Sequence, residues 1–150
     1  MNKKRLALIL VTIGLFIVTG CTNNNGPLEF RAIDNWNQDL KEDVAQINKL
    51  RGFKVLEQDK EGAIIYIGAG PKPTGGYGIK VKEAKREGDK TIINVAETKP
   101  GDDALVTQQI TYPFEVVKVI DVTKEIEVVT NTGERIESIS SSVFSRSRTT

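Results

Sequence analysis

The sequence predicts an α+β domain that is mainly β, in which one N-terminal amphipathic helix packs on an antiparallel sheet or a small β-sandwich. Two observations support this fold class. A single apolar stripe with helical spacing lies near residue 40, and the later apolar segments have strand character and are separated by turns that contain glycine and proline. The residues that follow the N-terminal segments are enough for one domain.

The first 20 residues have the features of a bacterial lipoprotein signal peptide. Three basic residues at positions 3–5 precede an apolar run over residues 6–18, which is shorter than the about 20 residues of a membrane-spanning helix. The run ends in VTGC, which resembles a lipobox, a motif whose cysteine is lipidated and before which the chain is cut. We therefore expect a diacylglyceryl anchor on Cys21 and a location in the bacterial cell envelope, on the extracytoplasmic face of a membrane. The alternatives are an ordinary signal peptide with an incidental cysteine and an anchor that stays uncleaved.

Polar segments flank the predicted domain. Residues 22–33 begin with TNNNGP and are poor in apolar side chains. We interpret residues 21–33 as the lipidated cysteine and a flexible tether, which spans at most about 40 Å when fully extended. At the other end, residues 141–150 are polar and basic, and we expect them to be disordered.

The charge balance argues against one class of partner. Three of the 21 basic residues lie in the signal peptide, so residues 21–150 carry 18 basic and 20 acidic residues. A net charge of about −2 does not favour nucleic acid, whose phosphates need a basic surface. We expect two partners, the membrane through the lipid anchor and an unknown protein.

The amino-acid content also restricts the chemistry. The chain has no histidine, and its single cysteine is the expected lipidation site. Ser-His-Asp and Cys-His catalysis, zinc sites built from histidine and cysteine, and internal disulfides are therefore not available. Carboxylate or Ser-Lys chemistry stays formally possible, but no spacing indicates it. We predict that the protein is not an enzyme and that it holds no metal or cofactor.

The first predicted element is the helix. Its apolar stripe consists of Trp36, Leu40, Val44, Ile47 and Leu50, and charged or polar residues fill the positions between them. Asp34 is a candidate N-cap, and Gly52 is a candidate end in a left-handed conformation. We expect Trp36 to be a core residue rather than a binding aromatic.

The remaining predicted elements are strands. Their expected positions are residues 53–58, the continuous apolar run 64–67, a hairpin over 77–98 that turns at 87–89, a β-rich stretch over 105–120, and a last hairpin around 131–133. The apolar run is typical of a strand that is covered on both faces. Pro113 cannot donate a ladder hydrogen bond, so it marks a bulge, an edge or a break within the β-rich stretch.

One connection between predicted strands is unusually long. The segment GPKPTGGYGIKV at residues 70–81 uses about nine residues where a minimal hairpin needs two. Pro71 and Pro73 fix φ and remove two backbone donors, whereas Gly75 and Gly76 permit positive φ or the close approach of another backbone. Such a loop is pre-shaped, and pre-shaping lowers the entropy that is lost on binding.

Two side chains of this loop, Lys72 and Thr74, are expected to project from it, with Tyr77 at its base. The simpler interpretation is that proline and glycine serve only the turn. In that case the tyrosines Tyr77 and Tyr112 close the core beneath the loop.

Two motifs in this part of the chain resemble the PrcB C-terminal domain family. Members carry a Lys/Arg-Pro-Thr-Gly-Gly-Tyr segment, a loop with a proline, and a Thr-Tyr-Pro-Tyr/Phe segment that leads into a valine-rich strand. The matching residues here are Lys72, Pro73, Thr74, Gly75, Gly76 and Tyr77, then Pro100, and then Thr111, Tyr112, Pro113 and Phe114. The resemblance covers residues 34–120, which leaves residues 121–140 as an additional β-hairpin.

The resemblance implies an accessory role. The family is named after a lipoprotein subunit of a cell-surface protease complex, which is needed for assembly or maturation of the protease and is not the catalyst. We therefore expect the unknown protein partner to include a secreted or surface protease among its candidates. The hypothetical partner-binding residues are Lys72, Pro73, Thr74, Gly75, Gly76, Tyr77, Tyr112, Pro113 and Phe114, which we expect to lie side by side on one face.

A second resemblance supports an alternative function. KPTGGY is similar to the Asn-Pro-Thr-Thr-Gly-Tyr loop of chagasin-type cysteine-peptidase inhibitors, which are small β-sandwiches that insert loops into a protease cleft. Lys72 and Gly75 depart from that pattern, and the other inhibitor loops have no clear match.

Overall fold

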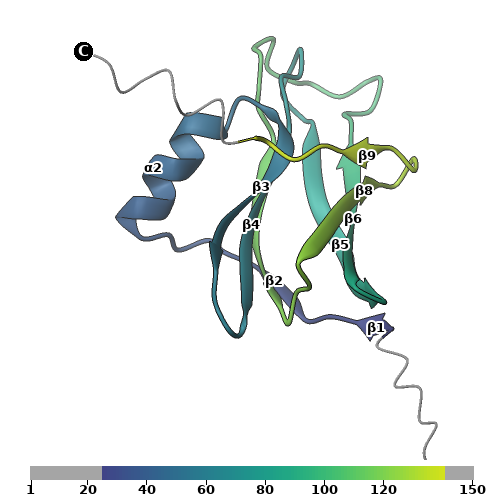
Figure 1. Ribbon diagram of the computed structural model, residues 1–150. Helices are drawn as coiled ribbons and strands as arrows, with labels where there is room; N and C mark the ends of the chain where they lie inside the picture. Colours follow the sequence, from purple (N-terminus) through teal and green to yellow (C-terminus); the bar gives the residue numbers. More distant parts are fainter. Residues whose placement is uncertain (1–24, 141–150) are drawn as a thin grey trace, which may run out of the picture.

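Two β-sheets share one hydrophobic core in the computed structural model, which describes residues 25–140 (Figure 1). The elements in chain order are β1 (Gly26–Pro27), β2 (Phe30–Ala32), α2 (Gln38–Ile47), β3 (Arg51–Gln58), β4 (Gly62–Ala69), β5 (Gly78–Glu87), β6 (Lys90–Thr98), β7 (Phe114–Ile120), β8 (Glu125–Thr130) and β9 (Arg135–Ile136). One sheet has five strands in the order β1-β5-β6-β8-β9, and the other has four in the order β2-β7-β4-β3. For residues 25–140, the prediction of a mainly β structure with one short helix is confirmed. The predicted signal peptide (1–20), Cys21 and the tail (141–150) lie outside the described residues.

The strand β4 lies inside the four-stranded sheet and is covered on both faces, as its continuous apolar run predicted. Ile65 and Ile67 belong to the core that the two sheets share, whereas Tyr66 belongs to a second cluster with α2. The Tyr66 hydroxyl donates to the backbone carbonyl oxygens of Ile47 at 3.1 Å and Leu50 at 3.3 Å. Burial raises the pKa of Tyr66 to about 12, so this hydroxyl stays a donor at neutral pH. The contact fastens the carboxyl end of the helix to the sheet.

The predicted apolar stripe does face the core. Leu40, Val44 and Ile47 are buried within α2, while Trp36 and Leu50 flank the helix and pack on the second cluster. The Trp36 ring lies 5.8 Å from the ring of Phe114, between centroids, and its indole N–H donates to the Ile33 carbonyl at 2.5 Å. Trp36 is therefore a core residue, as predicted.

Both predicted ends of the helix are wrong. Asn37 is extended and its side-chain oxygen accepts from the Leu40 amide at 2.8 Å, so Asn37 rather than Asp34 is the N-cap. Asn48 closes the helix, and β3 begins only three residues later. Gly52 therefore lies inside a strand, where an added β-carbon would meet the Ile139 side chain at 2.5 Å. Its hydrogen side chain serves close packing and not the end of the helix.

The segment after the expected lipidation site is more ordered than predicted. The flexible tether expected over residues 21–33 is wrong over residues 26–32, where β1 pairs with the end of β5 and β2 pairs with the end of β7. Leu28 and Phe30 pack against the shared core because they alternate with the exposed Glu29 and Arg31 as in a strand. The N-terminal segment therefore joins the edges of the two sheets along one side (Figure 1).

The C-terminal segment joins the sheets along the other side. The predicted hairpin is present as β8 and β9, but β8 pairs with β6 in parallel, so the five-stranded sheet is not entirely antiparallel. Beyond β9, the Phe53 amide donates to the Glu137 carbonyl at 3.0 Å, and the Ile139 amide donates to the Phe53 carbonyl at 2.8 Å. These bonds continue the segment along the edge of β3, and an edge that is covered is protected against pairing with other chains.

Most other predicted strands are confirmed, with one correction. The β5–β6 hairpin turns at Gly88, which has a φ of 60°. Residues 105–112 do not form the predicted strand, and only Thr111 makes an isolated bridge. Regular strand pairing begins with β7, directly after Pro113. Of the three expected roles of Pro113, a bulge, an edge or a break, the structure shows a break. Within residues 25–140 the structure contains no helix of a length and apolarity that would span a membrane.

Candidate protein-binding site

Two loops meet at one end of the sheets and form what we call the paired-loop surface. The first loop, residues 70–77, follows β4, and the second loop, residues 99–113, follows β6. The backbones of Lys72 and Thr111 exchange two hydrogen bonds of 2.8 and 3.0 Å, and the Thr111 hydroxyl donates to the Thr74 carbonyl at 2.7 Å. The predicted juxtaposition of the two motifs is therefore confirmed, and both loops rise at the top of Figure 1.

The two adjacent glycines of the first loop allow this close contact. The Gly75 amide donates to the Thr107 carbonyl at 2.9 Å, and a β-carbon on Gly75 would lie 2.5 Å from the Thr107 hydroxyl oxygen. Gly76 has a φ of 83°, and a β-carbon there would lie 2.9 Å from Pro100 and 3.0 Å from Val106. The two glycines thus let the second loop pack closely against the first loop. This agrees with the prediction that they permit the close approach of another backbone.

Lys72 does not project as predicted. Its ammonium lies 3.0 Å from a carboxylate oxygen of Glu97 on β6 and 5.9 Å from the centroid of the Tyr77 ring, and its side chain is only 20% exposed. Arg51 binds the other oxygen of the same carboxylate at 2.6 Å. Partial burial alone would raise the pKa of Glu97, but the hydrogen bonds and charges of Arg51 and Lys72 outweigh it and hold this pKa below its usual value. Lys72 therefore fixes the first loop to the sheet.

Thr74 is also engaged within the loops. Its side chain is half-buried, its hydroxyl donates to the Gly75 carbonyl at 3.1 Å, and its own carbonyl accepts from Thr111. The expectation that Thr74 projects from the loop is therefore wrong, because its hydroxyl and its carbonyl form hydrogen bonds within the two loops.

The second motif, residues 111–114, is held in position mainly by packing against the core. Phe114 packs between Trp36 and Tyr66, with its ring centroid 5.5 Å from that of Tyr66. The Pro113 carbonyl accepts from the Ala69 amide at 2.9 Å, and the half-buried Tyr112 ring lies 5.9 Å from the Lys49 ammonium. Among the nine predicted contact residues, Pro73 and Gly76 are exposed and the other seven are half-buried.

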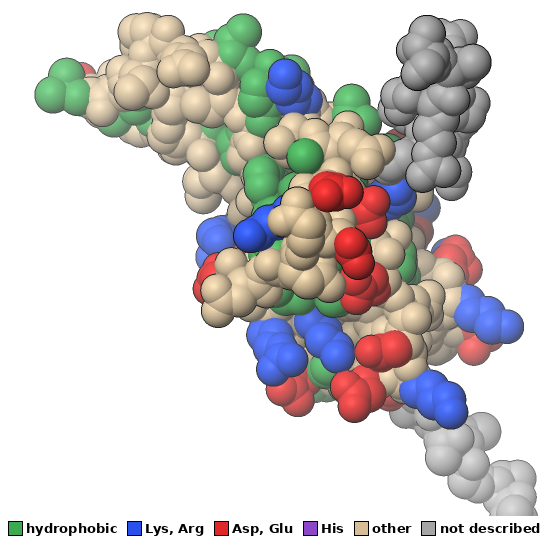
Figure 2. Space-filling model, turned by 90° about the vertical axis from the view of Figure 1, so that its left-hand side faces the viewer, with side chains coloured by type: hydrophobic (Ala, Val, Ile, Leu, Met, Phe, Trp, Pro, Cys, Tyr) green, Lys and Arg blue, Asp and Glu red, His purple; other side chains and the backbone are tan. Residues whose placement is uncertain are grey.

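Two residues that the sequence analysis missed are the most exposed large apolar side chains of the described chain. Leu105 is fully exposed and Ile110 is 57% exposed, and both lie on the second loop. Figure 2 shows apolar and uncharged side chains over the part that projects at the upper left and most charged side chains over the body below it. The signal in the sequence was the lack of strand alternation in GDDALVTQQI, where Ile110 stands between polar residues. Apolar side chains that are held exposed on a supported loop are suited to contact another protein.

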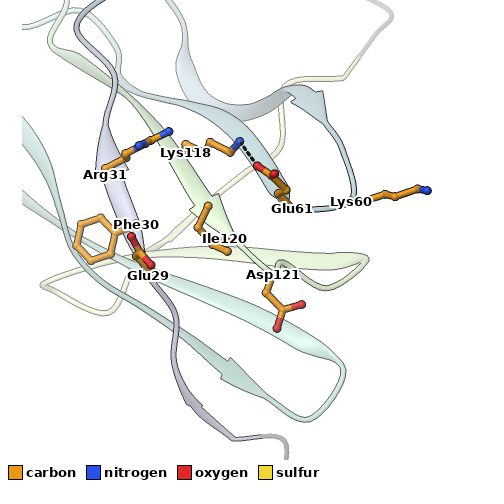
Figure 3. Close-up of a pocket in the computed structure, with 8 residues that line it drawn as sticks. All are labelled: Glu29, Phe30, Arg31, Lys60, Glu61, Lys118, Ile120 and Asp121. Carbon is orange, nitrogen blue, oxygen red and sulfur yellow. Dashed lines mark hydrogen bonds and ion pairs between the residues drawn. The ribbon is translucent and has the colours of Figure 1, made fainter.

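The structure also has a hollow of about 510 Å³ at the opposite end of the sheets (Figure 3). It is lined by Glu29, Phe30, Arg31, Lys60, Glu61, Lys118, Ile120 and Asp121. Its three cations balance its three carboxylates, and the Lys118 ammonium lies 3.2 Å from Glu61 and 3.7 Å from Asp59. Residues 25–140 contain no cluster of acidic, histidine or cysteine side chains that would hold a metal ion. The hollow is a solvated, charged surface and offers no set of converging catalytic groups.

The fold and the paired-loop surface together describe a small two-sheet domain with a candidate protein-binding end. Comparison with known families identifies its central part: residues 63–120 match the family model described as PrcB C-terminal. This match confirms the resemblance to the PrcB C-terminal family that the two motifs carry. The match runs from β4 to the last residue of β7 and contains both loops. No curated protein and no solved structure matches the chain.

Proposed function

We propose that the protein is a lipid-anchored, extracytoplasmic accessory protein that binds another protein through the paired-loop surface and has no catalytic activity of its own. One observation carries this proposal. Residues of the two family motifs connect the two loops by hydrogen bonds, and Leu105 and Ile110 are exposed on the second of these loops. A structure that stabilises exposed apolar side chains is explained by a partner that covers them.

The energetics support a contact of this kind. Complete burial of one leucine or isoleucine side chain contributes about 1.5–3 kcal/mol, and a few such anchors dominate the binding energy of many interfaces. A stable complex buries about 800 Å² on each partner, so neighbouring exposed residues must take part. Pro71, Pro73 and Ala104 are exposed on the same two loops and are suited to extend the contact.

The type of partner follows from the family and from the expected location. The family is named after an accessory subunit of a cell-surface protease, and the VTGC sequence leads us to expect this chain at the extracytoplasmic face of a membrane. We propose a secreted or surface protease, during its assembly or maturation, as the partner class. Family membership alone does not fix this role.

A chagasin-like inhibitor is the second candidate, and the loop geometry argues against it. An inhibitor of that kind inserts its KPTGGY-like loop into a protease cleft, whereas here Lys72 is paired with Glu97 and Gly75 lies against Thr107. Only the second loop is free to enter a cleft. The inhibitor hypothesis predicts inhibition of a mature peptidase, which the accessory hypothesis does not.

The test is crosslinking in the native cells, followed by pull-down and mass spectrometry. The wild-type chain is compared with Leu105→Ser/Ile110→Ser, and Lys60→Ser/Lys124→Ser is the matched control with two exposed changes in turns at the other end. We expect one extracytoplasmic protein to be lost with the first double variant and retained with the control. Equal capture by all three chains would refute the paired-loop surface as the binding site.

A further inference from the structure

We infer that the paired-loop surface is held at the end of the domain that is remote from the membrane, so that its occupant is a protein and not the lipid bilayer. This inference rests on the proposed lipid anchor at Cys21. The fold determines which end of the domain the anchor attaches to the membrane, and how far the exposed apolar loops then lie from the lipid.

The link between the anchor and the folded part is short. β1 begins at Gly26, and the Asn25 side chain already accepts a hydrogen bond from the Gly88 amide at 2.7 Å. Four residues after Cys21 the chain is therefore in contact with the β5–β6 turn. Four residues span at most about 14 Å, which is roughly a third of the reach of the tether predicted from sequence.

The attachment lies at one extreme end of the sheets. β1 pairs with the last part of β5, at Lys85 and Arg86, whereas the first loop leads into the first residue of β5. β5 has ten residues, which separates its ends by about 30 Å. The same polarity holds for β7, because the second loop precedes its first residue and β2 pairs near its last residue. In Figure 1 the N-terminal strand accordingly lies at the bottom and the two loops at the top.

The chemistry of the two ends agrees with this orientation. The attached end carries the hollow of Figure 3, whose lining is rich in charged side chains such as Arg31, Lys60 and Glu61, and these groups are compatible with hydrated lipid headgroups. The remote end carries the exposed Leu105 and Ile110. If those two side chains served to enter the bilayer, they would be expected at the attached end, because the link is shorter than the domain.

The orientation of the domain determines how far from the membrane a partner must bind. The domain length and the link place the paired-loop surface about 30–45 Å from the membrane surface. A protein that uses this surface must present its own docking site at that height, either from an extracytoplasmic domain of similar size or from a secreted molecule.

The test measures the distance of each end from the lipid in vesicles that carry the full lipidated chain. Lipidated Cys21 has no free thiol and is the only natural cysteine, so a fluorophore attaches only to an introduced one. Gln108→Cys labels the second loop and Asp89→Cys labels the β5–β6 turn, and both positions are exposed. Lipids with a nitroxide on the headgroup quench only a nearby fluorophore. We expect several-fold stronger quenching at position 89 than at position 108.

One control and two contrary outcomes separate the possible failures. A labelled Cys21→Ala chain should show no quenching at either position, because it is not attached. Equal quenching at positions 89 and 108 in the attached protein, or weaker vesicle binding after Leu105→Ser, would show that the loops contact the bilayer and would overturn the inference. Failure of the native chain to acquire lipid would instead refute the anchor, and with it the proposed location.

Discussion

The backbone amide of Val81 donates to the carboxylate of Glu115 at 2.6 Å, and this contact joins β5 of one sheet to β7 of the other. Glu115 is 8% exposed, and its second oxygen accepts from the Lys80 ammonium at 2.9 Å. The pairing of β5 with β6 shifts register directly after Val81. Glu115 therefore satisfies a buried backbone donor at an irregular point of the sheet.

Glu115→Ala should lower the free energy of unfolding by about 1–3 kcal/mol, because it leaves the buried Val81 amide without an acceptor. Lys80→Ala removes the partner ammonium, which is largely exposed, and should change the free energy by no more than about 0.5 kcal/mol. Urea denaturation of both variants measures the difference. If the two variants are equally stable, the amide contact does not contribute as described.

Gly76→Ala should destabilise the paired loops. The residue has a positive φ, and the new methyl group would press on Pro100 and Val106, so we expect a loss of about 1–3 kcal/mol. Gly101→Ala is the matched control, since it lies in the second loop with nothing within 4 Å of its added β-carbon. Thermal unfolding compares the two. A Gly76→Ala protein with unchanged stability that fails to capture its partner would instead make Gly76 a contact residue.

The ion pairs of Glu97 should make stability depend on pH in the acidic range. The pKa of Glu97 is lowered in the folded protein, so its pairs with Arg51 and Lys72 stabilise the fold at neutral pH. This contribution is lost as the pH falls below 4.5, the ordinary value for a glutamate, and through the lower folded-state pKa. Glu97→Gln should cost about 1 kcal/mol or less at pH 7 and nothing at the acid end of the titration.

Denaturation at several pH values between 7 and 3 measures this dependence. Glu57→Gln, which removes an exposed carboxylate from β3, is the control and should follow the wild-type curve. A stability difference between wild type and Glu97→Gln that stays constant over the whole range would contradict the role of the charge.

Substitution of Leu105 should weaken partner binding without loss of stability, whereas substitution of Phe114 should lower stability. Leu105→Ser changes a fully exposed side chain, so its melting temperature should stay close to that of the wild type while partner capture falls. Phe114→Ala removes a ring that packs on Trp36 and Tyr66 and should cost about 3 kcal/mol. Calorimetry with the capture assay tests both. A stable Phe114→Ala protein with impaired capture would return Phe114 to the contact face.

Cys21→Ala should abolish incorporation of labelled fatty acid and either release the chain from the membrane or leave the precursor uncleaved. The physical reason is that two acyl chains hold a protein stably on a bilayer, whereas the polar residues 22–25 do not. Metabolic labelling and fractionation measure this. Labelling and membrane retention that survive the change would exclude Cys21 as the anchor.

Local patterns in the sequence were sufficient for the elements whose signals lie within a few neighbouring residues. The apolar run 64–67 predicted a strand covered on both faces, the stripe around Val44 predicted the helix, and Gly88 predicted the turn of a hairpin. The proline-containing loop and the break at Pro113 predicted that residues 72–77 and 112–114 lie side by side. Each of these predictions needed only side-chain periodicity, the backbone preferences of glycine and proline, or a resemblance.

Tertiary structure alone decided which distant groups become partners. Lys72 pairs with Glu97, 25 residues away, and so is fixed to the sheet instead of projecting from its loop. Leu28 and Phe30 are ordered because the edges of β5 and β7 are open to their segment, and β8 completes the five-stranded sheet in parallel with β6. Leu105 is exposed on a loop that lies outside both sheets. Strand edges and charges pair across long stretches of chain, and the spacing of neighbouring residues does not encode those partners.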